Sequence, residues 1–148
     1  MPGKADTREL TQAASAMAYA LTRGRIHERM AESCGVRLER ASAALLRTLA
    51  NAGTPMRTSD LAELLLVRPP HVTRQVTRLA EEGLVERAAH GSDRRANLVH
   101  ITRKGRNVVT KLDAATHAWL ETVLHEVPAE DVRAAARVMR AVAEGCES

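Results

Sequence analysis

The segment that most constrains the fold is a short amphipathic stretch, residues 68–79, which opens with two prolines. Proline fixes φ at a helical value and lacks the N–H that a first helical turn leaves unbonded, so Pro69 predicts the start of a helix. Val72, Val76 and Leu79 then recur at the spacing of one helix face. The sequence therefore predicts a helix whose apolar stripe faces the core and whose other side is exposed.

A second short helix is predicted just before this one. Thr58 or Ser59 is a suitable N-cap for it, since a hydroxyl can accept a hydrogen bond from the first turn. The apolar residues that follow are expected inside; they are Leu61, Ala62, Leu64 and Leu65. Two short helices joined by a tight turn predict a helix-turn-helix.

The outer face of the 68–79 helix is polar and basic. A guanidinium fork matches O6 and N7 of guanine, so Arg74 is the expected base contact, whereas Arg78, further along the helix, is expected to meet phosphate. The residues of this helix that are predicted to contact DNA are Arg68, Pro70, His71, Thr73, Arg74 and Arg78. The alternative interpretation is that the arginines are merely solvated helix residues.

Positive charge is concentrated in the same part of the chain. Residues 67–106 carry nine Lys/Arg and four Asp/Glu, although the net charge of the whole chain is only +4. Phosphate backbones attract such a patch whatever the base sequence. The chain has one Tyr, one Trp and no Phe, which argues against aromatic stacking on single strands. Double-stranded DNA is the expected partner, and a basic surface without a partner is the alternative.

Two strands and a charged loop are predicted after the basic helix. The strands are expected at 84–87 and 98–101, and the ten-residue loop between them contains Gly91, Asp93, Arg94 and Arg95. A ribbon with arginine at its tip fits a narrow minor groove, where the negative potential is enhanced. Arg94 and Arg95 are therefore expected to contact DNA. Asp93 is expected to pair with a wing arginine and support the hairpin, or else to be an ordinary turn aspartate.

Longer helices are predicted on both sides of this region. One continuous helix of about 25 residues is expected from Thr7 to Gly35. Three other helices are expected, at 38–52, at 103 to about 126, and at 129–144. Thr102 is the expected N-cap of the second of these, and Gly145 is the expected C-terminal cap of the third. The interior face of the last helix is expected to consist of Val132, Ala135, Ala136, Met139 and Val142. These helices present more apolar surface than one small winged helix can cover, so burial between two subunits is predicted.

The predicted fold class is mainly α with a small β wing: a winged helix-turn-helix flanked by long N- and C-terminal dimerisation helices. The 148 residues are expected to form a single domain, 1–148, with a DNA-binding part at 38–105 and helical dimerisation parts at 7–35 and 106–148. A two-fold dimer would present two basic helices to half-sites about one helical turn apart. No secretory or membrane-spanning segment is recognisable, so a cytoplasmic location without membrane contact is expected.

The order of these elements resembles the MarR family of bacterial transcription regulators. The likeness rests most on Asp93-Arg-Arg-Ala-Asn-Leu-Val-His-Ile-Thr-Arg-Lys-Gly-Arg106, which follows Leu79-Ala-Glu-Glu-Gly-Leu-Val-Glu-Arg87. The resemblance implies a homodimer that binds an operator and is often released by a small molecule. A repressor is the expected role, and an activator is the alternative. It also implies that Arg95 enters the minor groove and that Asp93 supports it.

The chain departs from the family pattern at the turn between the two short helices. Leu66 stands where glycine is common, and if that position needs a positive φ, leucine costs roughly 1 kcal/mol or more. Arg68-Pro69-Pro70 replaces the usual Ser/Thr-rich helix start, so the side-chain N-cap is missing. These departures affect the identity of the base contacts and leave the docking mode unchanged.

An effector pocket is a further expectation from the resemblance. Many relatives hold a phenolic or aromatic acid between the dimer helices and the winged helix. The side chains that can contribute to such a pocket here are Tyr19, Arg23, His27, Arg47 and Trp119. Each can equally be a packed or solvated helix residue, so an effector is an open hypothesis.

Thiol and metal sensing are alternatives within the same fold. Cys34 lies near a predicted helix C-terminus, where the helix dipole disfavours a thiolate, although Arg37 and Arg40 can offset this. His117 and His125 are two helical turns apart, about 11 Å, which is too far to chelate one ion together. No metal and no cofactor are therefore expected.

Two other classes of function compete with DNA binding. A winged helix can serve as a protein-interaction module, but such a module has little use for an outward Arg74 and arginines at the wing tip. An enzyme is not expected because the sequence has no nucleophile–base pair in context, no glycine-rich phosphate loop and no paired carboxylates at a plausible site.

Overall fold

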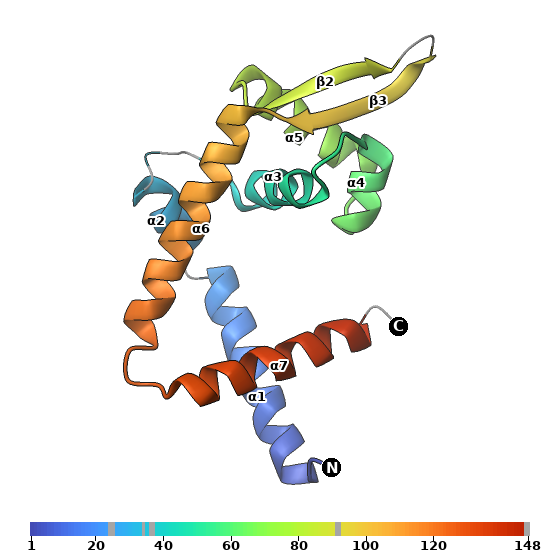
Figure 1. The fold of residues 1–148 in the computed structure, drawn as a ribbon. Helices are drawn as coiled ribbons and strands as arrows, with labels where there is room; N and C mark the ends of the chain where they lie inside the picture. The colour runs from blue at the N-terminus through green and yellow to red at the C-terminus, as the bar shows by residue number, and fades with distance from the viewer. Residues whose placement is uncertain (24–25, 34, 36–37, 91–92, 147–148) are drawn as a thin grey trace. The chain divides into compact units, whose positions relative to one another are not determined.

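The chain is mainly helical with one small sheet, as its sequence predicts. The computed structural model describes residues 1–148 except 24–25, 34, 36–37, 91–92 and 147–148, and of residues 23, 89–90 and 93–97 it describes the backbone alone. The elements in chain order (Figure 1) are α1 Lys4–Arg23, α2 Ile26–Ser33, α3 Arg40–Ala52, β1 Met56–Arg57, α4 Thr58–Leu64, α5 Pro69–Glu81, β2 Val85–His90, β3 Asp93–Ile101, α6 Arg103–Val123 and α7 Ala129–Cys146. The chain divides into two units, Met1–Ala115 and Thr116–Ser148.

The core of the first unit lies where α3, α4, α5 and the sheet meet. Leu46 of α3, Leu61 of α4, Val76 of α5 and Val99 of β3 are completely buried. Each lies on the apolar face of its own element, and these four faces pack against one another. The buried residues of α5 thus fix which side of this helix faces outward.

The N-terminal region does not form the single long helix that was predicted. Helix α1 already begins at Lys4, because the Asp6 carboxylate accepts a hydrogen bond from the Gly3 N–H at 2.8 Å and caps the first turn. Helix α1 ends at Arg23, and α2 begins at Ile26. A glycine inside a helix costs about 1 kcal/mol relative to alanine, and Gly24 stands at this junction in the sequence.

The predicted cap of α4 is also wrong. The N-cap is Arg57, in extended conformation and without a side-chain capping bond. Residues Met56 and Arg57 are held in this conformation because they form β1, which pairs with β3 through Met56↔Val99 and Arg57↔Leu98. Leu64, predicted inside, is 64% exposed because α4 ends there, whereas Leu61 and Ala62 are buried as expected.

The wing is a three-stranded antiparallel sheet with the order β1-β3-β2, rather than a two-stranded ribbon. The predicted ten-residue loop is largely absent, since β2 continues to His90 and β3 starts at Asp93, and these two residues are paired. A register irregularity between Ala88 and His90 interrupts the ladder. The backbone of Asp93, Arg94 and Arg95 therefore belongs to β3, while Gly91 lies outside the described residues.

Thr102 joins the sheet to α6. Its Oγ1 accepts a hydrogen bond from the Gly105 N–H at 3.0 Å, as the predicted cap does, and donates one to the Gly83 carbonyl at 2.7 Å. A Cβ at Gly105 would lie 2.2 Å from the Leu84 carbonyl oxygen, closer than atoms can pack. Glycine is therefore required for α6 to start this close to β2.

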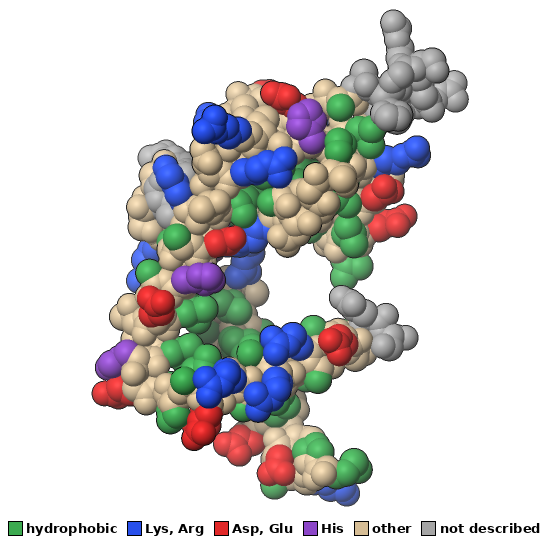
Figure 2. Space-filling model, viewed as in Figure 1, with side chains coloured by type: hydrophobic (Ala, Val, Ile, Leu, Met, Phe, Trp, Pro, Cys, Tyr) green, Lys and Arg blue, Asp and Glu red, His purple; other side chains and the backbone are tan. Residues whose placement is uncertain are grey.

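The C-terminal helices leave apolar side chains uncovered. Helix α6 ends at Val123 rather than near 126, and Gly145 lies inside α7 instead of capping it. No residue of α7 is buried, and Val138, Met139 and Val142 are exposed. The predicted interior face of α7 is thus not buried within this chain, and hydrophobic side chains are visible at the surface in Figure 2.

Among the described residues, none of the helices combines the length and the apolarity that crossing a bilayer requires.

Candidate nucleic-acid interface

Helix α5 presents one polar face to solvent. Val72, Val76 and Leu79 are buried as predicted, together with Gln75. Because a helix turns by about 100° per residue, burial of this stripe turns Arg74 and Arg78 outward, and both are exposed. The face therefore carries two guanidinium groups on a helix of the width that the major groove admits.

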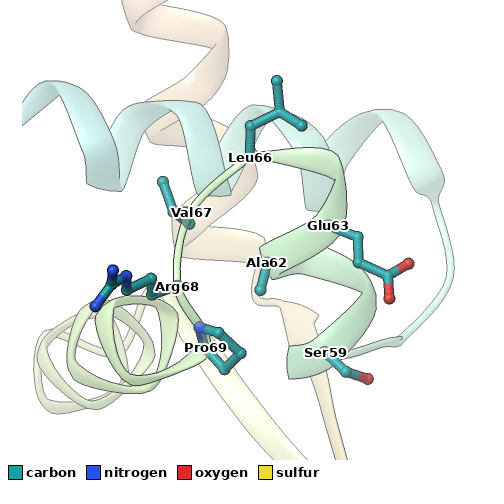
Figure 3. Close-up of a pocket in the computed structure, with 7 residues that line it drawn as sticks. All are labelled: Ser59, Ala62, Glu63, Leu66, Val67, Arg68 and Pro69. Carbon is teal, nitrogen blue, oxygen red and sulfur yellow. The ribbon is translucent and has the colours of Figure 1, made fainter.

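The turn between α4 and α5 contains a strained backbone position. Leu66 has a φ of 53°, the left-handed region that leucine rarely adopts, and it is the single non-glycine residue with positive φ in the described chain. Its N–H donates to the Glu63 carbonyl at 3.1 Å, and the N–H of Val67 donates to the Ala62 carbonyl at 3.0 Å. Figure 3 shows the Leu66 side chain pointing away from the turn, and it is 93% exposed.

The start of α5 has no side-chain cap, as the sequence predicts. Arg68 is the N-cap in extended conformation, and Pro69 and Pro70 occupy the first helical turn. Prolines have no N–H, so two of the donors that a cap would satisfy do not exist here. The first available donor, the N–H of His71, reaches the Arg68 carbonyl at 2.9 Å. Arg68 and Pro70 remain exposed at this end of the helix.

The threonines of α5 bond to their own helix. Thr73 Oγ1 donates to the Pro69 carbonyl at 3.1 Å, and Thr77 Oγ1 donates to the Thr73 carbonyl at 3.0 Å. Thr77 Oγ1 also accepts a hydrogen bond from Arg87 Nη2 of β2 at 3.0 Å. This bond ties the sheet to α5, and the sequence did not single out Arg87 because the contact joins two different elements.

Arg78 has an acidic partner that the sequence did not reveal. Its Nη1 donates to Oε1 of Glu39, the N-cap of α3, at 2.7 Å. The hydrogen bond and charge of Arg78 hold the pKa of Glu39 below its ordinary value, and Glu39 in turn raises the pKa of Arg78. The two residues are 39 positions apart, so no local pattern points to the pair.

The predicted wing residues can be placed only by their backbone. Asp93, Arg94 and Arg95 open β3, at the opposite end of this strand from the start of α6 (Figure 1). Their side chains, and hence the predicted pairing of Asp93 with a wing arginine, lie outside the described residues. Nearer the base of the sheet, the cross-strand neighbours Glu86 and His100 form a side-chain contact, with His100 Nε2 3.1 Å from Glu86 Oε2.

The predicted effector residues have different surroundings. Arg47 Nε donates to Asp113 Oδ1 of α6 at 2.9 Å, and His27 Nε2 lies 3.2 Å from the Leu38 carbonyl oxygen. Tyr19 is exposed on α1, and Trp119 is half-buried in α6 on the second unit. The side chain of Arg23 lies outside the described residues.

Cys34 lies outside the described residues, and Cys146 is an exposed free thiol at the end of α7. The described part of the chain contains no group of three His, Cys, Asp or Glu side chains placed to hold a metal ion.

Comparisons with known proteins agree with this architecture. The sequence model of the MarR family matches residues 38–96. The chain is 36% identical over 102 residues to the uncharacterized HTH-type transcriptional regulator Mb0904 of Mycobacterium bovis, a match that covers 67% of this chain and 71% of that protein. A MarR family protein from Bacillus stearothermophilus has the same fold, with a TM-score of 0.82 at 16% identity and full coverage of both chains. RV1404 from Mycobacterium tuberculosis gives a TM-score of 0.75 at 22% identity, covering 100% of this chain and 97% of that one.

Proposed function

Because the chain belongs to the MarR family of transcription regulators, we propose that it binds a pseudo-palindromic DNA operator as a homodimer and represses transcription there. The observation that carries this proposal is the exposed basic face of α5, which is fixed in direction by the buried stripe beneath it. Helix α5 is termed the recognition helix below. An interaction module would not need two outward arginines on such a helix.

The recognition helix enters the major groove in this proposal. Its N-terminal end meets base edges, so Arg74 reads guanine, and His71, Thr73 and Pro70 contact neighbouring positions. Arg68 and Arg78, at the two ends, meet phosphates. Arg74 is suited to its role since its side chain is exposed on this helix.

The wing reaches the adjacent minor groove. Arg95 enters the groove, Arg94 contacts the backbone beside it, and Asp93 holds the Arg95 side chain in place. The bond between Arg87 of β2 and Thr77 of α5 supports a fixed spacing between wing and recognition helix. Fixed spacing allows both elements to contact one duplex without rearrangement.

Dimerisation covers the apolar surface of the terminal helices. On α1, Leu10, Met17 and Leu21 are exposed at seven- and four-residue spacing, so they share one helix face. Helix α7 has an exposed apolar face as well. A second copy of the chain is the partner that would bury both, and its two-fold axis would place two recognition helices about one helical turn of DNA apart.

A small phenolic acid is the proposed effector class. The solved structure of NadR in complex with 4-hydroxyphenylacetate has the same fold, with a TM-score of 0.63 at 17% identity, covering 97% of this chain and 96% of that one. By analogy, such a ligand binds this chain near Tyr19, Arg23, His27, Arg47 or Trp119 and favours release from DNA.

The test is a gel shift with the DNA upstream of the gene that encodes the chain. We expect nanomolar binding whose affinity falls steeply with salt, because phosphate contacts release counterions. Arg74→Ala should weaken binding by about 1–3 kcal/mol, and Arg95→Ala should also reduce DNA affinity. Arg140→Ala on α7 removes the same charge outside the winged helix and should leave affinity nearly unchanged. Binding that is insensitive to salt, or Arg95→Ala without effect, would refute the proposal in favour of an interaction module.

A further inference from the structure

Glu39 connects the recognition helix to α3. Its carboxylate accepts the hydrogen bond from Arg78 Nη1 at 2.7 Å, at the point where the backbone of Glu39 is still extended and α3 is about to begin. An acidic side chain this close to an arginine of the recognition helix is unexpected on a surface that must approach phosphates. Its presence therefore calls for a specific role.

The carboxylate of Glu39 is backed by a buried polar pair. Ser42 and Gln75 are the two polar residues that are buried among the described residues, with 5% and 7% exposure. Ser42 Oγ donates to Gln75 Oε1, so both N–H donors of the Gln75 amide remain available for other partners. Gln75 also interacts with the carboxylate of Glu39 and helps to lower its pKa.

These contacts place a chain of polar groups between α3 and α5, from the core to the DNA-facing surface. Ser42 of α3 bonds to Gln75 of α5, and Arg78, three residues further along α5, bonds to Glu39 at the start of α3. A solvated surface ion pair is free to exchange partners. Here one end of the chain is fixed in the core, where a broken hydrogen bond would leave a buried polar group unsatisfied.

We propose that Glu39 is a positioning residue that holds the guanidinium of Arg78 in one orientation toward the phosphate it meets, which fixes the register in which Arg74 reads bases and thereby increases discrimination between DNA sequences. Only one of the five N–H groups of Arg78 is needed for Glu39, so others stay available for DNA. The negative charge of Glu39 also repels phosphates, which weakens binding to any duplex. This repulsion lowers the affinity for all duplexes alike, so only the orientation of Arg78 changes the ratio between the affinities for cognate and random DNA. The inference rests on the proposed DNA-binding function.

The test compares two duplexes. The parent protein first selects its preferred duplex from a random-sequence pool, and dissociation constants are then measured for that duplex and for a scrambled one of the same length at one salt concentration. Glu39→Gln keeps the size of the side chain and removes its charge. We expect the ratio of the two affinities to fall about tenfold, within the range that the base contact of Arg74 contributes to discrimination when its register is fixed. Affinity for the scrambled duplex should rise, because a negative charge is lost.

Two further variants separate positioning from charge. Glu63→Gln removes the same charge from the exposed side of α4, so it should change both affinities by a similar factor and preserve their ratio. Ser42→Ala removes the buried end of the polar chain without altering charge, and it should lower the ratio in the same direction as Glu39→Gln. Thermal melting of each variant verifies that it remains folded.

The outcomes are distinct. An unchanged ratio in Glu39→Gln overturns the inference, and so does a larger gain for the selected duplex than for the scrambled one, which would make Glu39 a competitor of DNA for Arg78. If the parent protein selects no duplex at all, the proposed function fails and the role of Glu39 fails with it. A parent that binds selectively, with a variant that discriminates equally well, refutes the positioning role alone.

Discussion

Replacing Leu66 by glycine should stabilise the protein. The φ of 53° costs a residue with a Cβ about 1–2 kcal/mol, a cost that glycine does not have. Glycine loses more backbone entropy on folding, which offsets about 0.5–1 kcal/mol of this gain. The leucine side chain is 93% exposed, so its removal forfeits at most about 0.2 kcal/mol of burial. The expected net gain in the free energy of unfolding is about 0.5–1 kcal/mol.

Urea denaturation followed by circular dichroism measures this gain. The midpoint should shift to higher urea for Leu66→Gly while the slope m stays constant, and Tm should rise by about 2–3 °C for a chain of this size. Both proteins must be compared at equal concentration, because binding of a second copy would shift the apparent stability.

Two control variants isolate the backbone effect. Leu66→Ala removes the exposed side chain but keeps a Cβ at positive φ, so it should leave stability nearly unchanged. Gly53→Ala places a Cβ at a φ of 67°, where no atom lies within 4 Å of it, so it should destabilise by about 1 kcal/mol through conformation alone. If Leu66→Ala stabilises as much as Leu66→Gly, exposure of the leucine rather than backbone strain is responsible, and the reasoning is refuted.

Three further predictions concern the glycines of α6 and α7, the N-cap of α4, and the ion pair between Glu39 and Arg78. Gly105→Ala should cost about 2–3 kcal/mol in urea denaturation, because its Cβ would overlap the Leu84 carbonyl, whereas Gly145→Ala inside α7, with nothing within 4 Å, should stabilise the protein by up to about 1 kcal/mol. Arg57→Ser should add about 0.5–1 kcal/mol by supplying the capping hydroxyl that α4 lacks, and a gain in Tm too small to measure would contradict this. In an NMR titration, the pKa of Glu39 should lie below that of an ordinary carboxyl and return toward it in Arg78→Gln. The contribution of this ion pair to stability is fully present above the unfolded-state pKa and is lost as pH falls through the lowered folded-state value.

Local pattern was sufficient to predict the recognition helix. Two prolines and a regular apolar spacing predicted a helix that begins at Pro69 and buries one face. The same spacing predicted that Arg74 points outward. The sequence also showed that Leu66 stands where related proteins commonly have glycine. The backbone does adopt a positive φ there, which glycine tolerates better than leucine. These predictions succeeded because they depend on residues within one or two helical turns.

Features that depend on distant residues were missed. Strand β1 has only two residues and forms because β3 offers an unpaired edge. Two residues are too few to show an apolar alternation in the sequence, so this strand could not be predicted. The wing strands continue through residues that resemble a loop, because each strand supplies the hydrogen bonds of the other. The pair between Glu39 and Arg78 depends on how α3 packs on α5, which single-sequence reasoning does not provide.

The contact at Gly105 has a mechanical consequence. The main chain of α6 packs there directly on the carbonyl of Leu84, the residue before β2, and the Ile101 side chain lies beside this contact. The Thr102 N–H bond to the Leu84 carbonyl, at 3.1 Å, binds the same two segments together. A tilt of the first turn of α6 therefore displaces the start of the hairpin by a similar amount. The angle of the wing thus follows the direction of this helix.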